Sequence, residues 1–436
     1  MVEFNSRQAA AQRRETILRY LERRQLYPFQ VRTEPSDDLR LLVVIPCFDE
    51  PDINVTINSV ARCDYPGCEV EALVVINGPE GMSAAARDNN LGVVQQIAGW
   101  GAGPGRELAE WLRVFAIRHE NLPVERAGVG LARKLGMDEA VARVGRTSQA
   151  DGLIISLDAD CEVASNYLVQ INEKFSDHPG CPGMSIYYEH AVPGHHNNPL
   201  HAAIIDYELH LRCYVAGQRL ARFPYAFHTV GSAMACRASS YAEQGGMNRR
   251  QGGEDFYFIQ KLAALSGYRA LNSTTVYPAA RLSNRVPFGT GPAMQNLLNA
   301  AESQETFSPE VYAELQAFCR LVLDSPPDRF MSGTEYLPET LQAFLQQQEF
   351  PARLAEIQSN VASAANFRKR VFRWFNAFRF LKFAQFASRE SHPKVPVADA
   401  ALQIARMAGI CEARDSASNT EWLEIYRCLD RHADSP

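Results

Sequence analysis

The chain has 436 residues, 46% of them hydrophobic and 22% charged, which is typical of a globular protein with two domains or one large extended domain. Its formal net charge of -6 excludes nucleic acid as a general partner, because proteins that follow a phosphate backbone carry a basic excess. No stretch approaches the roughly 18 apolar residues that cross a bilayer, and the N-terminus lacks the apolar core of a secretory signal. The ten cysteines include no C-x-x-C pair. We therefore expect a cytoplasmic protein with reduced thiols.

Strands and helices alternate in the first 160 residues. Residues 7–27 predict a polar amphipathic helix. Apolar runs then predict strands, and periodic segments between them predict helices near residues 52–60 and 128–144. The predicted strands cover residues 39–48, 69–81, 111–120 and 152–158. Because helices separate these strands, the pattern indicates an α/β domain with a mostly parallel sheet.

The pattern changes further along the chain. Residues 183–192 resemble a strand, and residues 200–217 and 252–268 are helical in pattern. From about residue 292 onward the chain is mostly helical. We therefore divide it into an N-terminal helical segment (1–38), an α/β domain (39–291) and a helical C-terminal region (292–436).

Two aspartates directly follow the strand predicted at residues 152–158. In "GLIISLDADC", Asp158 and Asp160 come at the carboxyl end of the strand, where open parallel sheets bind their ligands. On an extended chain end the two carboxylates project to the same side, so one can hold a hard divalent ion while the other contacts a ligand hydroxyl. The same two residues also fit a strand-end cap and a helix N-cap.

Two further acidic pairs accompany these aspartates. Asp49 and Glu50 follow the first strand in "VIPCFDE", and Glu254 and Asp255 open a helix in "GGEDFYFIQ". With "LARKLGMDEA" and "DAD" between them, in this order, residues 40–280 resemble the family 2 glycosyltransferases. The resemblance implies a GT-A-like fold, with a mostly parallel sheet flanked by helices, to which the mainly helical C-terminal region is an extension. It also implies a hexosyltransferase-like enzyme that uses a nucleotide-diphosphate sugar.

The resemblance assigns roles by position in the motifs. Asp160 would be the main ligand of a Mg²⁺ or Mn²⁺ ion, and Asp158, the other acid of the D-x-D motif, would face the ribose or sugar of the donor. Asp255 would be the catalytic base, and Glu254 beside it would contact the acceptor or tune that base. The donor pocket implied by the family comprises Pro46, Asp49, Glu50, Arg133 and Lys134, together with Asp158.

The chain departs from the family pattern at two places. Relatives usually end the second strand on an aspartate pair, whereas this chain has Ile76 and Asn77, so Asn77 occupies the position that contacts the base. The Q-x-x-R-W motif of processive polymer synthases is not apparent, which favours a single transfer over chain extension. Separately, Arg281 and Arg285 in "ARLSNRVPFGTG" are candidate guanidinium donors to the phosphates of the donor.

The chemistry that these residues allow is direct displacement with inversion. Asp255 would accept the proton of an acceptor hydroxyl, and the metal would neutralise the leaving diphosphate. Glu254 and Asp255 also fit a helix N-terminus that is stabilised only electrostatically. Three alternatives remain: a retaining GT-A sugar transferase, a nucleotidyltransferase of similar fold, and a non-catalytic binding protein.

A basic aromatic segment lies near the C-terminus. In "NFRKRVFRWFNAFRFLKFAQF", residues 366–386, apolar side chains recur at helical spacing among six arginines and lysines. The pattern favours core packing with snorkelling basic side chains. The alternative is peripheral contact of residues 366–387 with the inner face of a membrane. The acceptor, whether a saccharide, a lipid-linked molecule or a small molecule, cannot be read from the sequence.

Overall fold

The computed structural model describes residues 2–100, 108–147, 151–191, 199–281, 290–300, 304–326, 330–410 and 417–433. Packing divides the chain into two units, of which unit 1 comprises Met1–Pro193 and Thr229–Gln295, and unit 2 comprises Gly194–His228 and Asn296–Asp434. This division differs from the three consecutive segments that we expected, because helix α6 (Pro199–Leu220) packs with the C-terminal helices. Unit 2 is therefore built from two separate stretches of chain.

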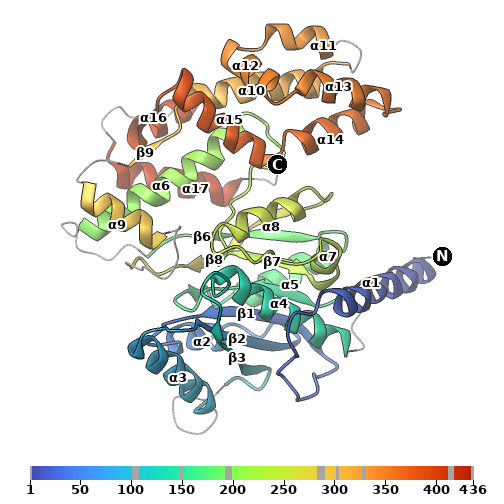
Figure 1. The fold of residues 1–436 in the computed structure, drawn as a ribbon, viewed down its shortest axis with the longest axis vertical. Coiled ribbons are helices and arrows are strands. Elements are labelled where there is room, and N and C mark those ends of the chain that lie inside the picture. The colour runs from blue at the N-terminus through green and yellow to red at the C-terminus, as the bar shows by residue number, and fades with distance from the viewer. Residues whose placement is uncertain are drawn as a thin grey trace. The chain divides into compact units, whose positions relative to one another are not determined.

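Unit 1 contains an eight-stranded sheet in the order β3-β2-β1-β4-β7-β6-β8-β5 (Figure 1). The strands are β1 (Leu39–Cys47), β2 (Glu69–Pro79), β3 (Leu112–Leu122), β4 (Leu153–Ser156), β5 (Glu162–Val163), β6 (Gly183–Tyr188), β7 (Met234–Arg237) and β8 (Arg269–Tyr277). Strands β3, β2, β1 and β4 are parallel, β6 is parallel to β8, and β7 is antiparallel to both of its neighbours. The predicted fold class, a mostly parallel sheet flanked by helices with a helical C-terminal region, is confirmed.

Helices flank this sheet. Those of unit 1 are α1 (Val2–Arg24), α2 (Asn54–Ala61), α3 (Ala84–Ala98), α4 (Val129–Gly145), α5 (Tyr167–Asp177), α7 (Ala238–Glu243) and α8 (Glu254–Ala263). Helix α4 packs on β1, β2 and β4. Gly136 allows this close approach, because a Cβ atom there would lie 2.4 Å from Val44 and 2.6 Å from Val75. The position of α4 over the parallel strands is therefore tightly fixed.

The described part of unit 2 is helical apart from one small antiparallel pair of strands, β9 (Glu305–Thr306) and β10 (Val395–Pro396). Besides α6, its helices are α10 (Pro309–Asp324), α11 (Phe330–Gly333), the 3-10 helix η1 (Thr334–Tyr336), α12 (Glu339–Gln347), α13 (Phe350–Ser359), α14 (Ala364–Trp374), α15 (Ala377–Glu390), α16 (Val397–Met407) and α17 (Asn419–His432). Helix α9 (Thr290–Ala300) begins in unit 1 and ends in unit 2, because the division falls after Gln295. No helix in the described ranges is both long and apolar enough to cross a bilayer.

The basic aromatic segment forms helices α14 and α15 of unit 2. Phe367, Val371 and Trp374 are buried, and Trp374 stacks on Phe350 with ring centroids 4.5 Å apart. The guanidinium of Arg379 lies 4.3 Å from the centroid of the Trp374 ring. Most of the aromatic side chains therefore belong to the core of unit 2, as core packing predicts, and the basic side chains border them.

Candidate active site

Three parallel strands carry polar residues to one edge of the sheet in unit 1. Strands β2, β1 and β4 are adjacent and parallel, so their carboxyl ends share this edge. Asp49 and Glu50 follow β1, and Asp158 and Asp160 follow β4. Asp49 has a φ of 53°, which is uncommon for a residue with a side chain. Its backbone N-H donates to the side chain of Asn90 at 3.1 Å, which helps to hold the turn.

Arg281, which follows β8, joins two of these carboxylates. Its two terminal nitrogens donate to the carboxylate of Glu50, and its Nε donates to Oδ2 of Asp160 at 2.8 Å. The side chain of Glu50 is only 3% exposed, whereas that of Asp160 is 25% exposed. Arg281 therefore neutralises a buried acid while it contacts an acid that solvent reaches.

Arg133 on α4 joins the aspartates that follow β4 to the acidic pair that begins α8. Its Nη2 donates to Oδ1 of Asp158 at 2.5 Å, its Nη1 donates to Oε1 of Glu254, and its Nε donates to Oγ of Ser156 at 3.2 Å. The Arg133 side chain is 4% exposed. A Cβ atom on Gly231 would lie 2.6 to 2.8 Å from the guanidinium, so the backbone at Gly231 covers it closely. Arg133 is thus a buried bridge between the end of β4 and the start of α8.

Glycines bring the start of α8 close to α4. A Cβ atom on Gly130 would lie 2.2 Å from the carbonyl oxygen of Arg250, and one on Gly128 would lie 2.9 Å from Cα of Gln251. Gly253 caps α8 with a φ of 69°, in the left-handed region that favours glycine. The glycine-rich sequences at both places therefore position Glu254 next to Arg133.

Asp255 adjoins this bridge and has a perturbed pKa. Burial, and then repulsion from the neighbouring Glu254, raise the pKa of Asp255 to about 6, against the opposing effect of Arg133. The backbone N-H of Phe256 donates to Oδ1 of Asp255 at 2.7 Å. A carboxyl group that titrates near neutral pH suits general base catalysis.

Arg281 pairs with Glu50 and Asp160, and Arg133 pairs with Asp158 and Glu254, so the two groups of ion pairs adjoin along the chain at Asp158 and Asp160. We call them together the acid network; its carboxyl groups are Glu50, Asp158, Asp160, Glu254 and Asp255, and its guanidinium groups are Arg133 and Arg281. When all are ionised, the five carboxylates exceed the two guanidiniums by three charges. Among the described residues, no three His, Cys, Asp or Glu side chains come together as a complete metal site. Two accessible carboxylates, Asp158 and Asp160, nevertheless match the donors that Mg²⁺ takes together with substrate phosphates.

The remaining predicted site residues lie in different surroundings. Pro46 lies in β1 and pairs in register with Val75, one residue before the end of the strand. Asn77 is buried near the end of β2, and its side-chain amide donates to the carbonyl of Gly128 at 3.4 Å. Arg285 lies outside the described residues.

The side chain of Lys134 does not contact the acid network. Its Nζ lies 2.8 Å from Asp138 and 2.7 Å from the hydroxyl of Tyr20 on α1, and Tyr241 also donates to Asp138. This buried group joins α1, α4 and α7. Lys134 therefore packs away from its neighbour Arg133, and it has no hydrogen bond or ion pair with those predicted donor-binding residues that the structure describes.

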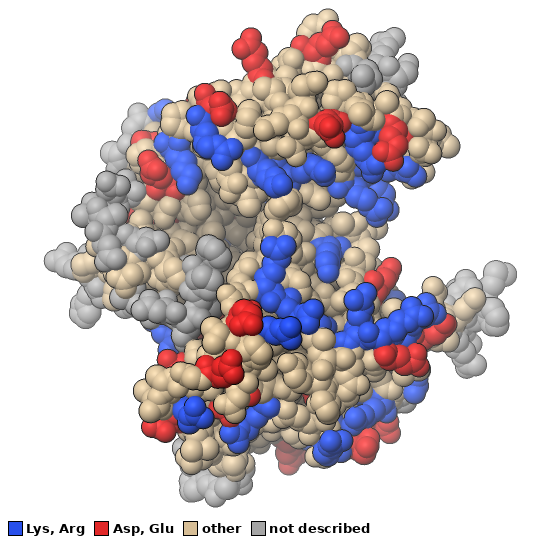
Figure 2. All heavy atoms as spheres, viewed as in Figure 1, with Lys and Arg blue, Asp and Glu red and all other residues tan. Residues whose placement is uncertain are grey.

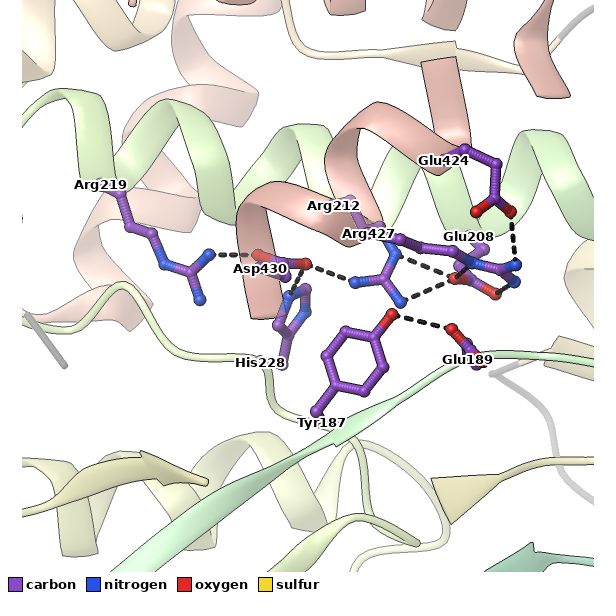
Figure 3. Close-up of polar contacts among 9 residues, drawn as sticks. All are labelled: Tyr187, Glu189, Glu208, Arg212, Arg219, His228, Glu424, Arg427 and Asp430. Carbon is purple, nitrogen blue, oxygen red and sulfur yellow. Dashed lines mark hydrogen bonds and ion pairs between the residues drawn. The ribbon is translucent and has the colours of Figure 1, made fainter. Parts of the chain in front are cut away.

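Unit 2 contains a second network of arginines and carboxylates, the buried ion network (Figure 3). Asp430 on α17 accepts hydrogen bonds from Arg212 and Arg219 of α6 and lies 2.9 Å from Nε2 of His228, while Arg427 of α17 donates to both carboxylate oxygens of Glu208. Burial alone would raise the pKa of Asp430, but His228 and the arginines outweigh it and hold that pKa below its ordinary range. His228 is thus a member of this network.

No protein-family model matches the sequence, and no curated protein matches it. Similar solved structures include S. aureus TarS 1–349 in complex with UDP-GlcNAc, at 14% identity over 90% of each chain with a TM-score of 0.40. Another structure of TarS 1–349 is 13% identical over 78% of this chain and 93% of that one, with a TM-score of 0.38. At these TM-scores the likeness is distant, so the evidence for function lies in the residues of the site itself.

Proposed function

We propose that the chain is a glycosyltransferase that moves a single sugar from a nucleotide-diphosphate sugar to an acceptor hydroxyl with inversion. The observation that carries this proposal is the acid network, in which Arg133 and Arg281 connect acids from three segments at the carboxyl edge of the sheet. Strand-end caps and a lone helix N-terminus do not require such a connection.

The charge of the acid network supports a requirement for a divalent cation. A bare nucleotide diphosphate is itself anionic, and the excess of carboxylates would repel it. Asp160 and Asp158 would hold Mg²⁺ or Mn²⁺, which supplies positive charge to the leaving diphosphate when bound. Arg281 would add guanidinium donors to the same oxygens.

Asp255 would act as the base. It would take the proton of the acceptor hydroxyl as that oxygen bonds to the anomeric carbon and the bond to the diphosphate breaks. Glu254 raises the proton affinity of Asp255, and Arg133 holds Glu254 in place. Arg133 would therefore orient the acids rather than bind the donor directly.

Residues at the ends of β1 and β2 would line the nucleotide pocket. Pro46, Asp49, Glu50 and Asn77 belong to these strands or follow them directly at the same edge. The acceptor would be a saccharide, a small molecule or a lipid-linked molecule. In the last case, contact with a membrane through residues 366–387 would bring the enzyme to its acceptor.

The proposal is tested by thermal unfolding of the purified protein with a panel of nucleoside diphosphates and nucleotide sugars, with and without Mn²⁺. We expect one nucleotide to stabilise the protein only when Mn²⁺ is present, by about 2.7 kcal/mol at a 100-fold excess over its Kd. Asp160→Asn should abolish this stabilisation, whereas Asp88→Asn, at an exposed position on α3, should keep it.

Product analysis separates this proposal from its alternatives. An inverted anomeric centre supports Asp255 as the base of a direct displacement, and a retained centre indicates the retaining type of transferase. Release of free pyrophosphate would indicate a nucleotidyltransferase. No stabilisation by any nucleotide, with or without metal, would contradict the proposal.

A further inference from the structure

The outward side of α14 and α15 in unit 2 is strongly basic. Residues 364–394 contain eight arginines and lysines and one acid, Glu390, whereas the chain as a whole has 44 basic and 50 acidic residues. Figure 2 shows Lys and Arg side chains in a row across the part of unit 2 where Figure 1 labels these helices. Positive charge is therefore concentrated on one small part of an acidic protein.

The packing of the two helices directs this charge outward. Five basic residues on them are exposed, and we call these the basic face: Lys369, Arg370, Arg373, Lys382 and Arg389. The opposite sides of α14 and α15 are buried in the core of unit 2. Lys382 and Arg389 are seven positions apart, so they lie along one side of α15. The basic face is thus held in place by the aromatic core beneath it.

The charges of the basic face are not balanced within the protein. None of its five residues has an ion pair within the described ranges of the chain. Other exposed arginines of unit 2 do have such partners, since Arg353 pairs with Glu356 and Arg222 lies 3.8 Å from Asp324. The basic face is therefore available to an external anion.

Apolar groups beside the basic face favour a lipid surface over a soluble polyanion. Phe378 and Leu381 on α15 are half-buried, and Nζ of Lys382 lies 4.7 Å from the centroid of the Phe378 ring. Cations beside partly exposed apolar groups match the boundary between the headgroups and the acyl chains of a bilayer. A polyphosphate would gain nothing from those groups.

We propose that the basic face docks unit 2 on the surface of an anionic lipid bilayer. The attraction is electrostatic, because the large aromatic residues of α14 are committed to the core and do not insert. No residue of the acid network takes part, so docking does not depend on the proposed transfer reaction. Membrane contact of residues 366–387 was the alternative to core packing, and the proposal restricts it to a defined set of exposed charges, while the buried aromatic side chains of α14 take no part.

Co-sedimentation of the full chain with lipid vesicles tests this proposal. We expect binding to phosphatidylcholine vesicles that contain 30% phosphatidylglycerol, little binding to pure phosphatidylcholine, and release as the salt concentration rises from 0.1 to 0.5 M. Each basic residue near an anionic surface strengthens binding about fivefold, so loss of three positive charges weakens it about 100-fold. The triple variant Lys369→Glu, Arg370→Glu, Arg373→Glu also adds three negative charges and should bind more than about 100-fold more weakly.

A second triple variant serves as the matched control. Arg62→Glu, Arg87→Glu and Arg146→Glu change the same total charge at exposed positions of unit 1 and should leave vesicle binding close to normal. The double variant Lys382→Glu, Arg389→Glu on α15 provides a second test if the α14 variant does not fold. Equal losses in both triple variants would overturn the proposal, as would binding to polyphosphate or RNA without binding to anionic vesicles. A variant that loses vesicle binding but keeps its nucleotide-dependent stabilisation separates this proposal from the proposed reaction.

Discussion

The acid network of unit 1 and the buried ion network of unit 2 are made of the same groups, yet they differ in balance and exposure. In the acid network, carboxylates outnumber guanidiniums, and the side chains of Asp158 and Asp160 are 38% and 25% exposed. In the buried ion network, Asp430 and Glu208 are buried and each accepts hydrogen bonds from two arginines. The number of arginine-carboxylate pairs alone would therefore not distinguish the acid network from the buried ion network.

The difference indicates what each network is for. Buried charges cost desolvation energy even when they are paired, and removal of one partner is strongly destabilising because the other charge is left uncompensated, so such pairs hold their helices together in one arrangement. Accessible carboxylates in excess of their partners remain able to bind a cation and a ligand. We therefore assign chemistry to the acid network and structure to the buried ion network.

The largest effect expected is on catalysis by the acid network. Asp255→Asn removes the proposed base while it keeps the size of the side chain, so we expect kcat to fall about 10² to 10⁴-fold with the affinity for the nucleotide nearly unchanged. Steady-state kinetics with the donor found by thermal unfolding measures this loss. Asp88→Asn is the control, and full activity in Asp255→Asn would remove the base from the mechanism.

The next effect is on the stability of the buried ion network. Asp430→Asn leaves Arg212 and Arg219 without their shared carboxylate, and we expect it to lower the free energy of unfolding by about 3 to 5 kcal/mol. Because the native pKa of Asp430 lies below its ordinary value, its stabilisation is present at neutral pH and is lost only as acid protonates it in the folded state. Denaturant unfolding checks the prediction, and an unchanged midpoint would contradict it.

A smaller effect concerns the pH dependence of activity. If Asp255 is the base and titrates near pH 6, kcat/KM should fall about tenfold for each pH unit below 6 and level off above it. The raised pKa also means that ionised Asp255 destabilises the fold at neutral pH, and that this cost shrinks as the pH falls through 6 and is absent below the ordinary pKa of 3.8. A pH-rate profile that is flat between pH 5 and 8 would exclude this role.

The smallest effect is expected on stability, at the solvent-exposed edge of the buried ion network. Glu424 pairs with Arg427 at 2.9 Å, but its side chain is 61% exposed. Glu424→Gln should therefore cost less than about 1 kcal/mol of stability, as is usual for an ion pair that solvent screens. Comparison of Glu424→Gln with Asp430→Asn tests whether burial of the ion pair determines how much unfolding free energy is lost. Equal losses in the two variants would contradict this explanation.

The sequence was most informative where burial imposes a simple pattern. The strands that became β1 and β4 were predicted because Leu41 to Val44 and Leu153 to Ile155 are apolar on both faces, as a sheet covered on both sides requires. The acids were then located by their position directly after these strands. These features depend only on local sequence and on the general behaviour of parallel sheets.

The sequence was least informative where the rotation of a helix decides the contact. Arg133 and Lys134 are neighbours and were both expected to bind the donor, but successive residues on α4 point about 100° apart. One side chain reaches Asp158, while the other reaches Asp138 and Tyr20. Ser156 and Gly231, which support Arg133, were missed because a small residue near a site gives no distinctive signal. The place of α6 in unit 2 was missed because its partners lie far along the chain.

The sequence separation between α6 and α17 affects how unit 2 folds during synthesis. Arg212 and its partner Asp430 are separated by 218 positions, and the ribosome needs roughly 10 to 40 s to add that many residues. Throughout this interval Glu208 and Arg212 can pair only with each other on α6, without Arg427 and Asp430 of α17. The native packing of α6 against α17 can form only after α17 has emerged, so the nascent chain passes a long period in which α6 lacks this partner.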